Sequence, residues 1–415
     1  MSAASEIRVE TFANGLTLIA ERMPHVRSAA FNLILPAGAA YDPADKRGLA
    51  GVLSDLMVRG AGSLDHRQLT LALDRLGLDR SQGVGPLLMH FNGATLGRHL
   101  LSALRVYADI LRRPHLPAHE LEPVRSLALQ HLQSLEDDPQ SKVLAELKKR
   151  HVPAPLGYHP GGTAEGLRAI AIEDVRRQYQ TYVHPGAMIL AVAGDVDWPA
   201  LVDTVGALFA DWSAGATPPL TLGSRGERQA HLAKETQQTH IGLAYPAVPI
   251  GHPDYYAALG AVNVLSGGMS ARLFTEVREK RGLCYAVWAS YQTFREQGHV
   301  FCYAGTTAER AQETLEVVLQ VIRSLAQGVQ RDEVERVQAG LKASLIMQQE
   351  ATGARASRLA SDWYFLGRIR TFEEIHKAID ELTPDTITDY VRRYPPDDIT
   401  LVTLGPKPLQ WSASL

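Results

Sequence analysis

The chain has 415 residues, a length that favours two domains of ordinary size over one. Hydrophobic residues make up 45% of it and charged residues 21%, proportions typical of a soluble globular protein whose halves can each bury a core. The net charge of −3 gives no sign of a nucleic-acid or membrane partner. No run of about 18 uncharged apolar residues is present, which excludes a membrane-spanning helix.

The N-terminus and the cysteines bear on the compartment. No basic segment followed by an apolar run is evident at the start, so the sequence indicates no signal peptide and favours a cytoplasmic protein. Only two cysteines occur, Cys284 and Cys302, in neighbouring predicted strands. Such sparse use favours a reducing compartment, with both thiols as small core residues; a disulfide between them is the alternative.

Strand and helix patterns alternate in the first half. Two strand patterns flank Asn14-Gly15, a dipeptide that favours a hairpin because both residues tolerate positive φ. A helix is predicted from about Gly48 to Arg59, with a glycine-rich loop at 83–86 further on. The later elements are predicted helices at 97–113 and 117–150, the second broken at Asp138-Pro139, a helix near 173–182, an apolar strand at 187–195 and a helix at 198–212.

Residues 213–230 are small, polar and rich in proline and glycine, which predicts a linker. The second half repeats the plan of the first. Its predicted strands cover 240–245, 283–293, 299–305 and 399–406, and its predicted helices 253–265, 307–327, 331–348, 354–366 and 384–393. We therefore expect an α+β protein of two tandem, similarly folded domains, 1–212 and 231–415, that arose by internal duplication.

One stretch of the second half, Gly267 to Tyr285, carries the most specific signal. Leu273, Phe274 and Val277 give a helix a buried stripe, Gly282 is placed as its left-handed C-cap, and an alternating strand pattern begins near Tyr285. Its string Ser-Ala-Arg-Leu-Phe-Thr-Glu-Val-Arg-Glu-Lys-Arg-Gly-Leu-Cys-Tyr resembles the C-terminal halves of the inverzincin metallopeptidases, among them pitrilysin, insulin-degrading enzyme and the mitochondrial processing peptidase.

In those proteins an arginine and a tyrosine seven residues apart bind substrate beside a zinc held by another domain. The resemblance implies that Arg278 and Tyr285 form this pair here. The spacing alone would fit equally a surface arginine and a core tyrosine. The resemblance covers essentially the whole chain and implies tandem domains that form half of a clam shell.

The same resemblance shows what the first half lacks. Active members carry His-x-x-Glu-His on a helix, where the histidines bind zinc and the glutamate takes a proton from zinc-bound water. In the matching helix Gly51 and Asp55 stand at the histidine positions and Ser54 at the position of the base. His131 stands where a second helix would supply the third ligand. Two mixed ligands make a poor zinc site, so we expect no metal in this chain.

The resemblance therefore implies a non-catalytic subunit, inactive alone, in a heterodimeric zinc metalloendopeptidase. A homologous partner would carry His-x-x-Glu-His and the zinc, and Arg278 and Tyr285 would bind peptide substrate in trans. A structural scaffold subunit is the alternative, although a scaffold has no need of the pair. A third interpretation is a stand-alone peptide-binding protein or homodimer.

Overall fold

A computed structural model describes residues 6–411, which form two compact units. Unit 1 contains the residues up to Ser134, Ala154–Gly223 and Met347–Gly367, and unit 2 contains Leu135–Pro153, Ser224–Ile346 and the residues from Arg368. Each unit is a mixed sheet packed with helices, which confirms the predicted α+β class with two domains. No helix in the described part of the chain has the length and apolar character needed to cross a membrane.

Unit 1 is built on a six-stranded sheet in the order β1-β2-β8-β3-β7-β6. The β2–β8 pair is parallel and the other pairs are antiparallel. β8 is buried along its whole length, because its run Ile-Leu-Ala-Val-Ala-Gly offers no polar side chain for solvent. The strands are β1 (Ile7–Thr11), β2 (Thr17–Arg22), β3 (Ser28–Leu35), β6 (Asp79–Val84), β7 (Met89–Leu96) and β8 (Ile189–Gly194), with a short hairpin of β4 (Gly60–Ala61) and β5 (Leu64–Asp65).

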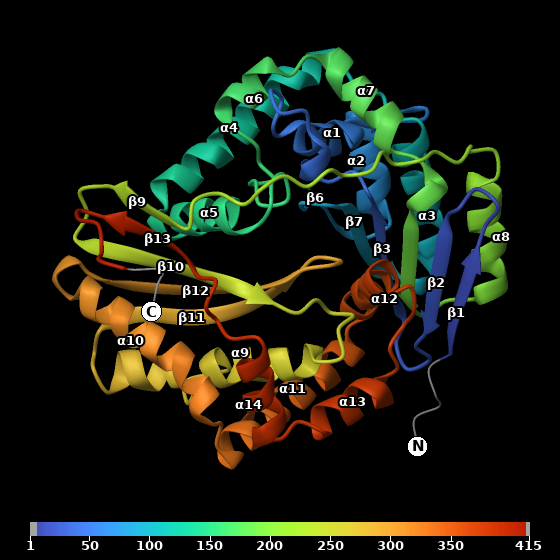
Figure 1. The fold of residues 1–415 in the computed structure, drawn as a ribbon. Helices are drawn as coiled ribbons and strands as arrows, with labels where there is room; N and C mark the ends of the chain where they lie inside the picture. Colours follow the sequence, from blue (N-terminus) through green and yellow to red (C-terminus); the bar gives the residue numbers. More distant parts are fainter. Residues whose placement is uncertain (1–5, 412–415) are drawn as a thin grey trace. The chain divides into compact units, whose positions relative to one another are not determined.

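Helices pack on both faces of this sheet (Figure 1). α3 and α8 lie on one face, and α12, which comes from the second half of the sequence, contacts β2, β3 and β8 on the other. The helices of the unit are α1 (Leu49–Met57), α2 (His66–Arg75), α3 (Gly97–Arg112), most of α4 (Leu121–Asp137), α6 (Ala164–Ala169), α7 (Ile172–Tyr182), α8 (Trp198–Phe209) and α12 (Thr352–Leu366).

Unit 2 has a five-stranded sheet in the order β11-β12-β10-β13-β9, in which only β9 and β13 are parallel. Figure 1 shows α5 on one face, against β10 and β13, and α9 and α10 on the other. The strands are β9 (Gln229–Ala233), β10 (Gln238–Ala247), β11 (Cys284–Thr293), β12 (Gly298–Thr307) and β13 (Thr400–Gly405). The helices are α5 (Pro139–His151), α9 (Tyr255–Ser266), α10 (Ala311–Ser324), most of α11 (Arg331–Glu350), α13 (Phe372–Asp380) and α14 (Pro384–Arg393).

The two units share one topology. The order β2-β8-β3-β7-β6 of unit 1 matches the order β9-β13-β10-β12-β11 of unit 2, with the same strand directions. β1 is an extra edge strand of unit 1. α5 covers the unit 2 sheet as α12 covers the unit 1 sheet. Each half of the sequence therefore lends one helix to the unit formed mainly by the other half, so the compact units cross the predicted boundaries at 212 and 231.

Local signals predicted several elements correctly. The Asn14-Gly15 hairpin joins β1 to β2, and the helical pattern of 117–150 breaks at Asp138, whose carboxylate accepts from the amides of Gln140 and Ser141 at the start of α5. The predicted loop at 83–86 is partly wrong, because Gly83 and Val84 belong to β6. β6 is an edge strand, where glycine is tolerated more readily than in a sheet centre. The patterns missed α2, α6, α13 and β9.

Candidate functional site

The helix predicted to match the zinc-motif helix is α1, and hydrogen bonds to Asp42 hold its N-terminus. Gly48 has a φ of 105°, which a side chain would strain, and the buried Asp42 accepts from the amides of Gly48 and Ala50 at 2.8 Å each. Burial raises the pKa of Asp42 to about 7 against these hydrogen bonds. The apolar face of α1 enters the unit 1 core, and Gly60, with a φ of 118°, ends the turn that follows the helix.

The four motif positions have different surroundings. A side chain at Gly51 would meet nothing within 4 Å, so an open space faces this position. Ser54 is buried, and its hydroxyl has no hydrogen-bond partner in the described residues. Asp55 is half-buried, and His131 is exposed on α4. Burial raises the pKa of Asp55, while a hydrogen bond from Gln82 and the charges of Arg59 and His131 oppose the rise.

The structure thus brings Asp55 and His131 within electrostatic range of each other, but the described residues add no third side chain that could bind a metal with them. Between residues 6 and 411 there is no group of three or more His, Cys, Asp or Glu side chains placed to hold a metal ion. Gly51 supplies no ligand, and a serine hydroxyl at position 54 cannot replace a carboxylate base. These residues do not fit a catalytic zinc site.

Arg278 lies on a helical turn wider than an α-helix. Residues Phe274–Glu279 form a π-helix, and the amide of Lys280 donates to the carbonyl of Thr275 at 2.9 Å, five residues back. The sequence pattern predicted an ordinary helix here, because so short a periodic stretch does not distinguish the two hydrogen-bond patterns. Arg278 is exposed, and its guanidinium carbon lies 4.9 Å from the centre of the Phe274 ring. Such single π turns occur often at functional sites.

Tyr285 lies on a β-bulge. Cys284 pairs with Thr306 of β12 and Ala286 pairs with Gly305, so Tyr285 is an extra residue without a partner on that strand. A bulge re-aims the side chain that it carries. Tyr285 is 78% exposed, an unusual fraction for a large aromatic side chain in a strand, and this excludes the core position that the spacing alone allowed.

The two residues flank one turn. Gly282 has the left-handed φ that was predicted, 56°, but it lies two residues after Lys280, the C-cap of the helical segment. Burial raises the pKa of Cys284 to about 11, and the charge of Arg278 opposes the rise, which places the guanidinium near the start of β11. Cys284 and Cys302 are free and buried on adjacent strands, as expected, and burial raises the pKa of Cys302 to about 12. Neither thiol is activated as a nucleophile.

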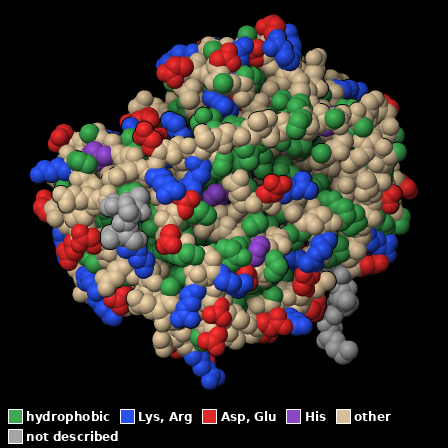
Figure 2. Space-filling model, viewed as in Figure 1, with side chains coloured by type: hydrophobic (Ala, Val, Ile, Leu, Met, Phe, Trp, Pro, Cys, Tyr) green, Lys and Arg blue, Asp and Glu red, His purple; other side chains and the backbone are tan. Residues whose placement is uncertain are grey.

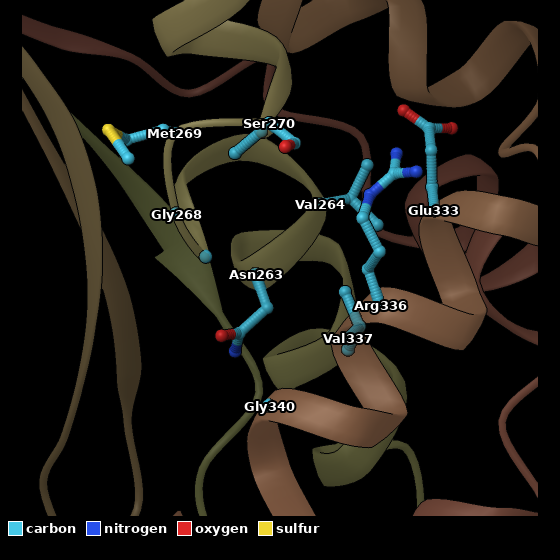
Figure 3. Close-up of a pocket in the computed structure, with 11 residues that line it drawn as sticks. Asn263, Val264, Gly268, Met269, Ser270, Glu333, Arg336, Val337 and Gly340 are labelled. Carbon is cyan, nitrogen blue, oxygen red and sulfur yellow. The ribbon is translucent and has the colours of Figure 1, made fainter.

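A small pocket of about 150 Å³ lies at the other end of the stretch (Figure 3). The end of α9, the segment Gly267–Ala271 and one face of α11 line it. Met269 at its rim is 75% exposed, and Glu333 and Arg336 project from α11. Sequence reasoning identified the glycine pair but not this pocket, because its second wall comes from a helix more than 60 residues further along the chain.

Charged side chains are mixed on the one face of the described residues that Figure 2 draws. On the face drawn in Figure 2, basic and acidic side chains are interspersed, with no large area of one sign. This agrees with the near-zero net charge of the chain.

Solved structures share this fold. The peptidase M16 inactive domain from Pseudomonas fluorescens matches with a TM-score of 0.90 at 20% identity, over 98% of this chain and 99% of that chain. A protease from Helicobacter pylori matches with a TM-score of 0.90 at 16% identity, over 97% and 100% of the two chains. A chain of Complex III2 from Candida albicans matches with a TM-score of 0.83 at 18% identity, over 97% and 96%.

Sequence comparison gives the family. An uncharacterized zinc protease of Bacillus subtilis, YmxG, is 26% identical over 403 residues, which cover 96% of this chain and 98% of that protein. An uncharacterized zinc protease of Rickettsia felis is 24% identical over 97% of this chain and 98% of that protein. The family model for insulinase (peptidase family M16) matches residues 17–159, and that for the peptidase M16 inactive domain matches residues 169–341. The chain belongs to the M16 peptidase family.

Proposed function

We propose that this chain is the non-catalytic subunit of a heterodimeric M16 zinc peptidase. A homologous partner would carry His-x-x-Glu-His and form one half of a clam shell. This chain would form the other half, enclosing a chamber for the peptide substrate, and would supply Arg278 and Tyr285 to bind it. The observation that carries the proposal is the contrast between the two sites. The positions Gly51 and Ser54 cannot serve zinc chemistry, whereas Tyr285 stands 78% exposed on a bulge, one turn after Arg278.

The proposed pair suits a peptide carbonyl whose negative charge grows during hydrolysis. The guanidinium of Arg278 offers several donors in a fixed plane, and the phenol of Tyr285 can donate to the same oxygen. Donors held in place before the reaction stabilise such charge more than mobile water does. The partner's zinc would activate the attacking water. Within this chain the two side chains bind and orient the peptide. We place the complex in the cytoplasm, the reducing compartment that the sparse cysteine use favours.

A scaffold role is the second candidate, with a stand-alone peptide-binding protein as the third. The fold does not separate these, because one fold can serve unrelated functions. The exposure of Tyr285 favours a ligand-binding role, since a large apolar ring left in water without a ligand brings a scaffold no stability.

The test is hydrolysis of a quenched fluorescent peptide by this chain, by a zinc-motif partner and by their mixture. We expect activity in the mixture alone. Arg278→Ala or Tyr285→Phe should lower kcat/KM of the mixture about 10²-fold, as loss of one oxyanion donor does, without changing complex formation. Arg331→Ala is the matched control, because that side chain is 88% exposed and its ion pair with Glu335 lies on α11.

Two results would count against the proposal. Activity of this chain alone would contradict the interpretation of Gly51, Ser54 and Asp55. An active mixture whose kcat/KM is unchanged by Arg278→Ala and by Tyr285→Phe would favour the scaffold role.

A further inference from the structure

The turn between Arg278 and Tyr285 is held by side chains from outside it. Arg310 donates from Nη1 to the carbonyl of Gly282 at 2.8 Å and from Nη2 to the carbonyl of Arg281 at 2.9 Å. Thr306 donates from Oγ1 to the carbonyl of Leu283 at 2.6 Å. Three successive carbonyls of this turn therefore have side-chain donors.

The donors are themselves linked. Thr306 on β12 is 2% exposed, and Thr314 on α10 is fully buried. The hydroxyl of Thr314 lies 3.1 Å from that of Thr306 and 2.8 Å from the carbonyl of Arg310, so its one proton serves either acceptor. The end of β12 and the first turn of α10 thus form one polar support beneath the turn.

Arg310 suits its place in this support. The carbonyls at the end of a helical segment lack partners within it, and a planar guanidinium can satisfy two neighbouring oxygens at once. A lysine would place one charge and could not bridge both oxygens in the same way. Arg310 also lies 3.8 Å from Glu313, at 42% side-chain exposure, so its removal empties no core volume.

Because Tyr285 lies on the bulge, this polar support affects the direction of its side chain. Its neighbours Cys284 and Ala286 pair with β12, but Tyr285 itself has no partner there. The direction of its side chain therefore depends on the turn that precedes it. That turn is also closed by the amides of Gly282 and Leu283, which donate to the carbonyls of Arg278 and Val277 at 3.0 and 2.9 Å.

We propose that Arg310 is a positioning residue for the Arg278/Tyr285 pair. Its two hydrogen bonds fix the turn so that the guanidinium of Arg278 and the phenol of Tyr285 reach the same peptide group. This inference rests on the proposed function and adds to it a residue that touches no substrate.

The experiment measures peptide hydrolysis by the mixture of this chain and its zinc-motif partner, with Arg310→Ala, Arg310→Lys and the control Arg331→Ala. Arg310→Ala should lower kcat/KM about tenfold, the effect of losing charge-assisted hydrogen bonds, and Arg310→Lys should fall between it and the wild type. Arg331→Ala should leave the rate unchanged.

Two further readouts separate positioning from general structure. Amide exchange at Gly282 and Leu283, measured on this chain alone, should rise about tenfold in Arg310→Ala while the midpoint of thermal unfolding stays within a few degrees. In the mixture, Arg310→Ala should add little to Tyr285→Phe, because both act through the same phenol.

The outcomes distinguish the two proposals. If Tyr285→Phe and Arg278→Ala leave the mixture unaffected, the proposed function fails and this inference fails with it. Suppose instead that those variants impair the mixture. If Arg310→Ala then leaves kcat/KM unchanged, only the positioning role is wrong. The same holds if the fold-losses in kcat/KM of Arg310→Ala and Tyr285→Phe multiply in the double variant. Unchanged amide exchange in Arg310→Ala would also overturn it.

Discussion

Two buried histidines of unit 2 meet edge to face, with ring centres 5.1 Å apart. The Nδ1 atom of His151 lies 2.7 Å from Nη2 of Arg225 and 2.9 Å from the hydroxyl of Thr400. Since arginine can only donate, this nitrogen accepts and His151 is neutral. Neither ring nitrogen of His299 has a hydrogen-bond partner in residues 6–411. Both rings are therefore adapted to the uncharged form.

Acid should destabilise the fold through this pair. Burial, with the charges of Arg225 and His299, lowers the pKa of His151 to about 2. Burial, with the charges of Arg225 and Lys148, lowers the pKa of His299 to about 4. In the unfolded chain a histidine has a pKa of about 6.5. Below about pH 6.5 the unfolded chain therefore binds protons that the folded chain does not, and the free energy of unfolding falls as the pH drops towards about 4. Above about pH 6.5 both states are neutral at these histidines and this loss is absent. At about pH 5 each histidine should cost about 2 kcal/mol.

Urea unfolding at about pH 7.5 and about pH 5 measures this loss. His299→Phe keeps an aromatic ring without a titrating group and should reduce the pH-dependent loss by about 2 kcal/mol. His25→Phe is the control, because that side chain lies on an exposed turn. The explanation fails if the pH dependence of unfolding is the same in His299→Phe and the wild type.

At the scale of elements, the sequence predicted what a local pattern encodes. Asn14-Gly15, Asp138-Pro139 and Gly282 each constrain their own backbone, and all three have the backbone conformation that was predicted. The bulge at Tyr285 could not be predicted from the sequence pattern. One extra residue changes the register of strand β11 against β12 without changing the residue types in the strand. The assignment of Gly51, Ser54 and Asp55 to the zinc-motif positions rests on resemblance and stays a prediction, whereas the approach of His131 to Asp55 depends on how α4 packs.

The place of α12 could not be predicted either, since its apolar face indicates burial but not against which sheet. A buried ion pair joins α12 to β2. Arg355 on α12, 7% exposed, donates from Nε to Oε2 of Glu21 on β2 at 2.9 Å and from Nη2 to the same oxygen. Glu21 is 3% exposed, so the loss of one partner leaves a buried charge.

We expect Arg355→Met to lower the free energy of unfolding by about 3–5 kcal/mol, because Glu21 then keeps its desolvation cost without compensation. Glu21→Leu combined with Arg355→Met should restore most of the loss, since apolar groups of similar volume can replace a buried pair. Denaturant unfolding of the single and double variants gives both values. A single variant within about 0.5 kcal/mol of the wild type, as expected for Arg331→Ala, would contradict this role.

The whole molecule combines an internal repeat with an exchange of helices. The repeat was predicted from matching patterns in the two halves, and the strand orders agree with it. The exchange was not predicted. In sequence α5 lies within the first half and α12 within the second, and no local pattern shows which sheet each helix covers. α5 covers β10 and β13 of unit 2, and α12 covers β3 and β8 of unit 1. Each unit therefore contains segments from both halves of the chain.

This arrangement makes a prediction for the separated halves. A fragment of residues 1–212 lacks α12, and a fragment of residues 231–415 lacks α5, so each leaves the central strands of its sheet uncovered. Such apolar surface is the main source of stability, and without it neither fragment should unfold cooperatively or show a native near-UV circular dichroism spectrum. Co-expressed fragments should purify together and regain both properties. The control is the full chain cleaved at a protease site within 213–230, which should keep its transition, because the cut leaves every exchanged helix in place. A 1–212 fragment that folds cooperatively alone would show that α12 is dispensable to unit 1.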